Sequence, residues 1–429
     1  MEKRVVITGI GVIAPNGIGK DNFWKALVSG ESGIKKISRF DASDYPVKIA
    51  GEVNDFNPLL FIEKKRAKHL SRFAQFILAA TQMAVDDSGL DLQNEDPYSI
   101  GIAFGTTVGG KEIDEQQQRI FREKGWRRVN PFSPILISNN CAVGVVATEF
   151  GIKGPNITTS TGCTSALNAI AYAYDLVVNN KANIVIAGGG EAPLVPFVFD
   201  AFCVSGVLSK RNGKPERVSR PFEKNRDGYV LSEGCGIVII EDLNHAVDRK
   251  TKIYAEIAGY GVTNDAYSLL KMEPTGEGVA RTIQEALKSA GEETGNIDYI
   301  NAHGSSSLVS DKRETNAIKM ALREHAYRVQ ISSIKSMLGQ PLGATGGIQV
   351  VSTALAITNG WIPPTINYEE EDPDCDLDYI PNRARKQKIN TALINSFGLG
   401  GNNVSMIIRR YENGENNIGK AEQNLAVNY

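Results

Sequence analysis

One pattern, a short apolar strand that runs into Gly-x-Gly, occurs twice in this chain and constrains its fold strongly. The first copy spans residues 5–12 and the second spans residues 255–262, about halfway along the 429 residues. Each half also has a later strand-like segment that leads into a polar loop, at residues 156–160 and 329–333. Because sites in α/β proteins form where strands end, two similar halves that face each other would bring these loops to one central site.

The segments between the two copies predict an α/β protein. Residues 184–188 and 237–240 are short runs rich in Ile and Val, typical of strands buried on both faces. Residues 73–88 and 165–178 have the length and composition of helices. Strands that alternate with helices indicate buried sheets covered by helices.

Composition and charge exclude several classes of protein. The chain is 42% hydrophobic and 22% charged, which is typical of a globular protein, and its formal charge of −2 gives no general attraction to nucleic acid. No apolar run is long enough to span a bilayer, and the N-terminus reads as a first strand rather than a signal peptide. The five cysteines are scattered without a C-x-x-C pair, which argues against a disulfide framework or a zinc site. We therefore expect a cytoplasmic protein.

A loose dinucleotide fingerprint, G-x-G-x-x-A, lies at residues 9–14. The residues that follow it are Pro-Asn-Gly, which favour a turn and not the start of a helix. We therefore predict that this segment binds no nucleotide.

Cys163 follows a strand-like segment and precedes a long apolar helix. A thiol at a helix N-terminus lies near the positive end of the helix dipole, which favours the thiolate, and the free N–H groups there can bind an oxyanion. The alternative is an inert buried cysteine, which is the interpretation that we keep for the other four.

Three motifs in this order resemble the active-site motifs of the β-ketoacyl-ACP synthases, the condensing enzymes of fatty acid and polyketide synthesis. They are TGCTSA at residues 161–166, NAHGSSS at 301–307 and KSMLGQPLGA at 335–344. That family uses one cysteine and two histidines. Cys163 and His303 match the cysteine and the first histidine, but Gln340 stands at the position of the second histidine.

The resemblance covers residues 3–411 and implies the five-layered αβαβα fold of the thiolase type. It implies an N-terminal half, residues 1–254, that carries Cys163, and a C-terminal half, residues 255–411, that carries His303 and Gln340. It also implies a homodimer and an acyl carrier protein (ACP) as partner. Nothing in the sequence requires a metal or redox cofactor. The tail at residues 412–429 is rich in Asn, Glu and Gly, and we expect it to be disordered.

The resemblance also implies roles for residues around these motifs. The loop NSFGLGGN at residues 395–402 matches a glycine-rich loop, in which the N–H of Leu399 would form the oxyanion hole together with that of Cys163. Leu399 stands where the family usually has Phe, and Asn402 where Thr is common. Three buried charged residues would pair with one another and hold the catalytic loops: Lys335, Asp311 and Glu314.

Gln340 decides which reaction the resemblance predicts. In the family, two imidazoles donate hydrogen bonds that stabilise the enolate formed when malonyl thioester loses CO₂. A glutamine amide can donate a hydrogen bond but cannot act as an acid or base. The leading expectation is therefore a nucleophile that needs no decarboxylation, a β-ketoacyl thioester deprotonated by His303. The ketosynthase/cyclase of bacterial stilbene biosynthesis, of the dialkylresorcinol type, performs that condensation and then closes a ring.

Two alternatives remain open. The first is an ordinary decarboxylative β-ketoacyl-ACP synthase II that elongates acyl-ACP with malonyl-ACP. The second is a non-catalytic partner subunit like a chain-length factor. Such subunits usually lack the cysteine, so the presence of Cys163 and His303 argues against this alternative.

A basic stretch at residues 63–72 is a candidate surface for docking the acidic carrier protein. We expect one helix to carry Lys64, Lys68 and Arg72 on one face. Further candidates for the same surface are Lys65, Arg127, Arg128, Lys210 and Arg211. The alternative is that these charged side chains are only solvated surface residues with no binding role.

Overall fold

The computed structural model describes residues 3–412. The tail predicted to be disordered therefore falls outside the described residues, except for Glu412. All five cysteines are free thiols. No helix within residues 3–412 is long and apolar enough to cross a membrane.

The core of the fold is one mixed sheet whose strands repeat the same order in each half. Strands of the first half follow the order β6, β5, β7, β8, β1, and those of the second half follow β11, β10, β14, β15, β9. Their bounds are β1 (Val5–Ala14), β5 (Ile100–Gly105), β6 (Asn156–Thr159), β7 (Ile184–Glu191), β8 (Gly234–Asp242), β9 (Ala255–Asn264), β10 (Tyr299–Asn301), β11 (Gln330–Ser332), β14 (Thr391–Phe397) and β15 (Asn402–Arg409). If the five strands of each half are numbered by their order along the chain, they lie side by side in the order third, second, fourth, fifth, first in both halves. The predicted internal repeat is thereby confirmed.

The two halves join where β1 pairs antiparallel with β9, with Val5 opposite Ile257. In the first half β5 pairs parallel with both of its neighbours, and in the second half β10 does the same. The remaining pairs within each half are antiparallel. Other strands of two or three residues lie outside this repeat: β2 (Gly17–Ile18), β3 (Ile34–Lys36), β4 (Ile49–Gly51), β12 (Trp361–Ile362) and β13 (Arg385–Lys386).

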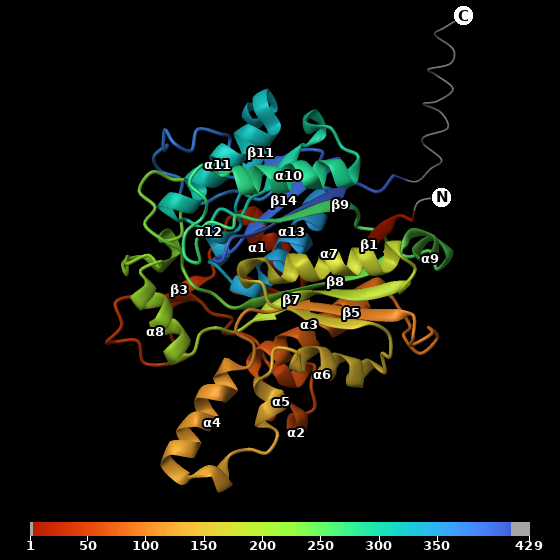
Figure 1. Cartoon of the computed structure of the whole chain (residues 1–429), viewed down its shortest axis with the longest axis vertical. Coiled ribbons are helices and arrows are strands. Elements are labelled where there is room, and N and C mark those ends of the chain that lie inside the picture. The colour runs from red at the N-terminus through yellow and green to blue at the C-terminus, as the bar shows by residue number, and fades with distance from the viewer. Residues whose placement is uncertain (1–2, 413–429) are drawn as a thin grey trace, which may run out of the picture.

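Helices complete five layers, which Figure 1 shows edge-on. The pair α3 (Arg72–Ser88) and α6 (Cys141–Phe150) covers the outer face of the first-half strands. The pair α10 (Glu277–Ala290) and α11 (Leu308–Leu322) covers the second half. Between the strands of the first half and those of the second half lie α7 (Ser165–Val178) and α13 (Thr345–Asn359), and every residue of α13 from 345 to 357 is buried. A helix that is buried on every side belongs in an interior, so the predicted αβαβα architecture is confirmed.

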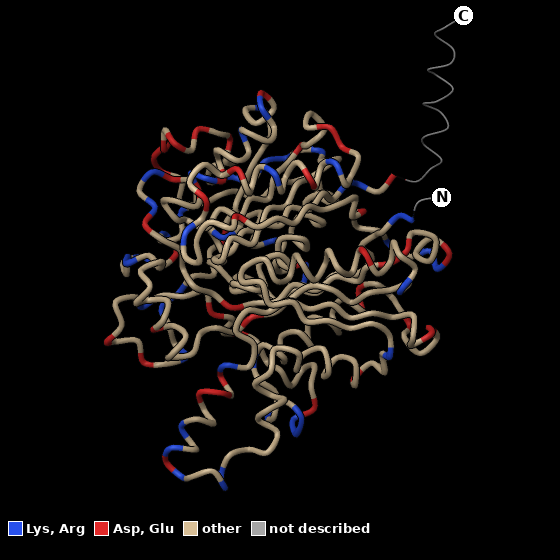
Figure 2. Tube along the Cα trace, viewed as in Figure 1, with Lys and Arg blue, Asp and Glu red and all other residues tan. Residues whose placement is uncertain are grey.

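The remaining helices lie around these layers. They are α1 (Lys20–Ser29), α2 (Lys64–Ala67), α4 (Lys111–Lys124), α5 (Ser133–Ile137), α8 (Pro196–Ser205), α9 (Leu243–Asp248) and α12 (Lys335–Leu338). Figure 2 shows that the charged residues gather at the periphery, while most of the central strands are uncharged.

The repeated Gly-x-Gly has the same packing role in both halves. A Cβ at Gly11 of β1 would lie 1.8 Å from the carbonyl oxygen of Ala80 in α3. A Cβ at Gly261 of β9 would lie 2.3 Å from the carbonyl oxygen of Thr282 in α10. Glycine therefore lets a helix approach the strand closely. This explains the dinucleotide-like pattern, because β1 continues through it as a buried strand to Ala14.

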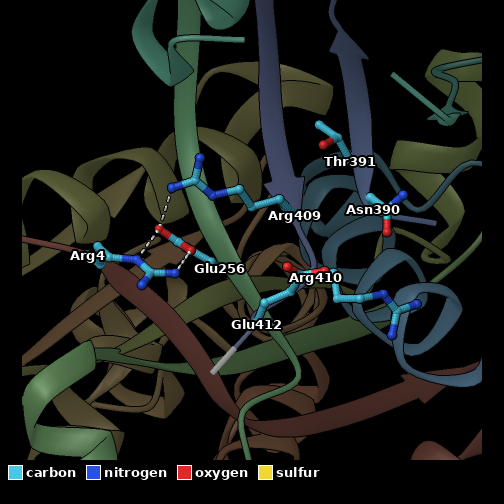
Figure 3. Close-up of a pocket in the computed structure, with 7 residues that line it drawn as sticks. All are labelled: Arg4, Glu256, Asn390, Thr391, Arg409, Arg410 and Glu412. Atoms are coloured by element: carbon cyan, nitrogen blue, oxygen red, sulfur yellow. Dashed lines mark hydrogen bonds and ion pairs between the residues drawn. The ribbon is translucent and has the colours of Figure 1, made fainter. Parts of the chain in front are cut away.

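A hollow of about 410 Å³ lies beside the junction of the halves. In Figure 3, Arg4 and Arg409 converge on Glu256, with Nη–Oε distances of 2.6 and 2.8 Å. Burial alone would raise the pKa of Glu256, but the hydrogen bonds from the two arginines outweigh it and hold the pKa below its ordinary value. These ion pairs link the start of the first half to two strands of the second.

Candidate active site

The three predicted catalytic residues line one cavity of about 610 Å³. Cys163 comes from a 3-10 turn, Gly162–Thr164, between β6 and α7. His303 follows β10, and Gln340 follows α12. The structure thus brings together loops from both halves of the chain, as the sequence predicts. Exposed side chains mark the open end of the cavity: Leu270, Lys271, Leu308, Val309 and Leu399.

Cys163 is held as a thiol and not as the thiolate that the helix N-terminus favours. Burial raises the pKa of its thiol to about 11, although the Lys335 charge and a hydrogen bond from Gln340 lower it. In the resting site, removing the sulfur from water has a larger effect on the pKa than the groups that favour the thiolate.

His303 is a neutral hydrogen-bond donor. Burial, assisted by the positive charge of Lys335, lowers the pKa of its imidazole well below 6.5. The N–H of Phe397 donates to Nδ1 at 3.2 Å. A neutral imidazole that accepts at Nδ1 carries its proton on Nε2, so an N–H remains available to a ligand in the cavity.

Gln340 is buried, with 2% of its surface exposed, and it is held on several sides. Its backbone N–H donates to the carbonyl of Val230 at 2.7 Å, and its carbonyl accepts from Ser232 at 3.1 Å. The hydroxyl of Thr345 donates to Oε1 at 3.2 Å, which leaves the amide nitrogen to act on the sulfur of Cys163. Gln340 therefore places a second neutral N–H donor beside the nucleophile.

Two buried carboxylates grip the His303 loop through its backbone. Glu314 accepts the N–H groups of His303 and Gly304 at 2.8 and 2.7 Å. Asp311 accepts the N–H of Ser305 at 2.9 Å. Both come from α11, so that helix sets the position of the loop.

Lys335, which belongs to the motif of Gln340, also holds the His303 loop, because its Nζ donates to the carbonyl of His303. The prediction that Lys335, Asp311 and Glu314 pair directly with one another is wrong. Among residues 3–412 no ion pair joins Lys335 to either carboxylate, since backbone N–H and C=O groups satisfy most of their polar atoms. Asp311 has an arginine partner instead, Arg226 at 3.6 Å.

The glycine-rich loop passes directly over the nucleophile. Ser396 donates to the carbonyl of Cys163 at 3.0 Å, and a Cβ at Gly398 would lie 3.3 Å from the Cys163 nitrogen. Leu399 lines the cavity and is 48% exposed. Its N–H takes part in none of the hydrogen bonds found in the described part of the chain. The loop is therefore close enough to act together with Cys163, and its oxyanion role stays a prediction.

Sequence reasoning missed three residues that support the site. Phe397 and Thr345 fix the His303 and Gln340 side chains, and only their tertiary positions reveal it. The third is Glu191, whose buried carboxylate accepts the N–H of Thr107 at 2.6 Å and that of Gly343 at 3.0 Å. A charged residue at the end of the apolar segment 184–190 was a signal that could have revealed it.

The basic stretch does not form the single helical face that was predicted. Helix α2 ends at Ala67 and α3 begins at Arg72, so Lys64 and Arg72 belong to different helices. Lys64, Lys65 and Lys68 are exposed. Arg211 is also exposed and lies 3.5 Å from Asp227, which lines the cavity.

Arg72 is a structural residue and not a surface charge. Its side chain is 14% exposed and donates to the fully buried Glu233 at 2.8 and 2.7 Å. Its guanidinium also lies 4.6 Å from the ring centroid of Phe76. Burial and this ion pair remove Arg72 from the candidate docking residues.

Replacing Arg72 with alanine should lower the free energy of unfolding by about 3–5 kcal/mol, because it leaves the Glu233 carboxylate buried without a partner. Urea denaturation would measure the loss. Lys68→Ala is the matched control, since an exposed lysine should change stability by no more than about 0.5 kcal/mol. Equal stability of the two variants would contradict the buried role of Arg72.

Comparison with known proteins supplies the family. The beta-ketoacyl synthase N-terminal domain matches residues 2–246, and the corresponding C-terminal domain matches residues 254–369. The chain is 44% identical over 411 residues to a 3-oxoacyl-(acyl-carrier-protein) synthase 2 of Synechocystis sp., covering 96% of this chain and 99% of that protein.

Two solved structures are also similar over 96% of this chain and 100% of the compared chains. One is a type II polyketide ketosynthase in complex with its acyl carrier protein and bound to the hexaketide, with 35% identity and a TM-score of 0.88. The other is the ishigamide ketosynthase/chain length factor, with 34% identity and a TM-score of 0.90. With its two matched domains and its close relatives, this chain belongs to the β-ketoacyl-ACP synthase II family of condensing acyltransferases.

Proposed function

We propose that this enzyme joins an acyl group on Cys163 to the carbanion released by decarboxylation of a malonyl thioester carried by ACP. One observation carries the proposal: His303 and Gln340 are both neutral N–H donors that line the cavity of Cys163. Two donors are what the developing enolate oxygen needs, and a preformed pair stabilises it without reorganisation. The relative from Synechocystis is named as a synthase of this type.

In the first step, the sulfur of Cys163 attacks the acyl thioester, and the N–H groups of Cys163 and Leu399 bind the oxyanion. The carrier thiolate leaves and takes up the proton that the Cys163 thiol gives up. The positive charge of Lys335 and the donor of Gln340 favour the thiolate as the thiol loses this proton.

In the second step, malonyl thioester binds with its carbonyl oxygen between His303 and Gln340. The C–C bond to the carboxylate breaks and CO₂ leaves. The electron pair of that bond forms the enolate, whose oxygen accepts hydrogen bonds from the two N–H groups. The enolate carbon then attacks the acyl-Cys163 carbonyl. A carbon–carbon bond forms, and the Cys163 thiolate leaves and takes a proton from solvent.

Non-decarboxylative condensation of the stilbene type is the second candidate, and the absence of an imidazole at Gln340 favours it. The smaller Leu399 at the cavity mouth would also suit a bulky acyl group. That reaction needs a base to remove a C2 proton from a β-ketoacyl thioester. His303 serves that role poorly, because Phe397 occupies the Nδ1 lone pair and Nε2 already carries a proton.

One experiment separates the two candidates. The acyl-Cys163 enzyme is mixed with malonyl-ACP or with β-ketoacyl-ACP, and products and CO₂ are followed by mass spectrometry. Release of CO₂ and a chain extended by two carbons are expected with malonyl-ACP. Condensation with β-ketoacyl-ACP alone, followed by a cyclised product, would overturn the decarboxylative proposal. Gln340→His is the matched variant and should retain decarboxylation, because imidazole can donate the same hydrogen bond.

We propose that the acidic carrier protein docks on the exposed lysines Lys64 and Lys65 of α2 and on Lys68, which follows this helix. The similar polyketide ketosynthase, solved in complex with its carrier protein, supports such a partner. Lys65→Glu and Lys68→Glu should raise KM for ACP-linked substrate several-fold with little change in kcat, because rim charges mainly steer association. Lys181→Glu, at another exposed lysine, is the control. Steady-state kinetics would measure KM for both lysine variants. A wild-type KM in both variants would refute the docking of the carrier protein on these lysines.

We also propose a homodimer formed along β6, which ends the sheet and pairs on one side only, with β5. An unpaired strand edge is a ready site for pairing with a second chain. The hydroxyl of Thr158 on this strand is buried and has no hydrogen-bond partner among residues 3–412. Light scattering coupled to gel filtration should give twice the mass of the 46.5 kDa chain, and a monomer would exclude this interface.

A further inference from the structure

Tyr229 lines the active-site cavity, and its phenol hydroxyl makes no hydrogen bond in the described part of the chain. The backbone around it is fixed: its N–H donates to Val207 at 3.2 Å, and its carbonyl accepts from Ser209 at 3.0 Å. The ring packs edge-on against Phe202, with 6.4 Å between centroids. Since the residue is partly exposed and lines the cavity, its hydroxyl is a polar group left available to a ligand.

Tyr229 and the nucleophile Cys163 line the same cavity. Val230, the next residue, accepts the backbone N–H of Gln340 at 2.7 Å, so the Tyr229 segment is tied to the catalytic loop. Burial raises the pKa of Tyr229 well above its ordinary value, and negative charge on Cys163, when the thiol loses its proton, raises it further. The phenol therefore keeps its proton and can donate it in a hydrogen bond.

The surroundings of Tyr229 are mostly apolar. Phe202, Val207 and Leu342 line the cavity and belong to the same hydrophobic cluster as Tyr229. A saturated acyl chain that displaces water here would leave the phenol without a hydrogen-bond partner, which is unfavourable. An acyl chain with an oxygen in reach would restore that bond.

We propose that Tyr229 is a specificity-determining residue that favours acyl groups carrying a keto or hydroxyl oxygen close to the thioester. Its O–H donates to that oxygen while the acyl group is bound to Cys163. The inference rests on the proposed function only in using Cys163 as the acyl acceptor. The chain received from the carrier protein would then come from a condensation or a keto reduction, before any step that removes the oxygen.

Loading of Cys163 tests this inference without any condensation. The enzyme is offered hexanoyl, 3-hydroxyhexanoyl and 3-oxohexanoyl groups on the same ACP, and the rate of acyl-enzyme formation is measured by intact-protein mass spectrometry. The wild-type enzyme should load at least one oxygenated group faster than hexanoyl. In Tyr229→Phe the ratio of oxygenated to hexanoyl loading should fall by about tenfold, the effect expected for one lost hydrogen bond.

Tyr327→Phe, which changes an exposed tyrosine, is the matched control and should keep the wild-type ratio. Equal loading of all three groups by the wild-type enzyme would overturn the inference. So would a Tyr229→Phe variant that keeps the wild-type ratio. Because loading needs no malonyl thioester, a failure here is distinguishable from a failure of the decarboxylative step.

Discussion

Replacing Cys163 with alanine should abolish condensation, with a loss of about 10⁶-fold, the size seen when a nucleophile is removed from a serine protease. The effect is this large because no other group can take the role. Cys163 is the thiol that lines the cavity with His303 and Gln340, and the first step forms a covalent bond to its sulfur. Intact-protein mass spectrometry should detect no acyl adduct on the variant after incubation with acyl-ACP.

Cys203→Ala is the matched control for this loss. Cys203 is another partly exposed thiol, on α8, and it is not among the residues that line the active-site cavity. Its variant should load and condense at the wild-type rate. Full product formation by Cys163→Ala would contradict the covalent mechanism and would revive the reading of this chain as a non-catalytic partner subunit.

Replacing His303 with alanine should slow decarboxylation by about 10²–10³-fold, the cost of removing one preorganised donor from an oxyanion site. Acyl loading of Cys163 should change much less, because the first step uses other N–H groups. CO₂ release from malonyl-ACP and acyl-adduct formation would be measured separately. An equal loss in both would mean that the substitution disturbs the loop and not only the donor.

The pH profile adds a sharper test of His303. Burial and the Lys335 charge hold the pKa of the imidazole well below 6.5, so protonation of the ring is confined to acid pH. The decarboxylation rate should therefore show no inflection from His303 between about pH 6 and pH 9. His303→Gln keeps a neutral N–H donor and should recover part of the rate. An activity that rises through a pKa near 6.5 would contradict the donor role.

The opposite behaviour is expected for the nucleophile. With a pKa of about 11, Cys163 becomes more reactive toward a thiol reagent as pH rises through the neutral range. The rate with iodoacetamide should still be increasing at about pH 9, since only the thiolate reacts.

Much of the fold and of the catalytic set could be predicted from the amino-acid order. Alternating buried strands and helices indicate the class, and the repeated Gly-x-Gly indicates two similar halves. The motifs around Cys163, His303 and Gln340 are each one contiguous stretch of sequence. They could be recognised because each is a short loop that directly follows a strand or helix.

Other features depended on tertiary contacts. The basic stretch reads as one helix, but the break after Ala67 and the buried partner Glu233 turn Arg72 into a structural residue. Lys335, Asp311 and Glu314 are buried as expected, yet their partners are mostly backbone groups of the His303 loop. Such partners leave no trace in the residue types.

By itself, the sequence determined the layered α/β architecture, the nucleophile and the exchange at Gln340, because strand patterns and local motifs need only neighbouring residues. Only the tertiary structure decided the protonation states. Burial makes Cys163 a thiol and His303 a neutral imidazole, and the Phe397 N–H selects the tautomer. Those states depend on desolvation and on charges brought together from both halves, and the order of residues along the chain does not specify either.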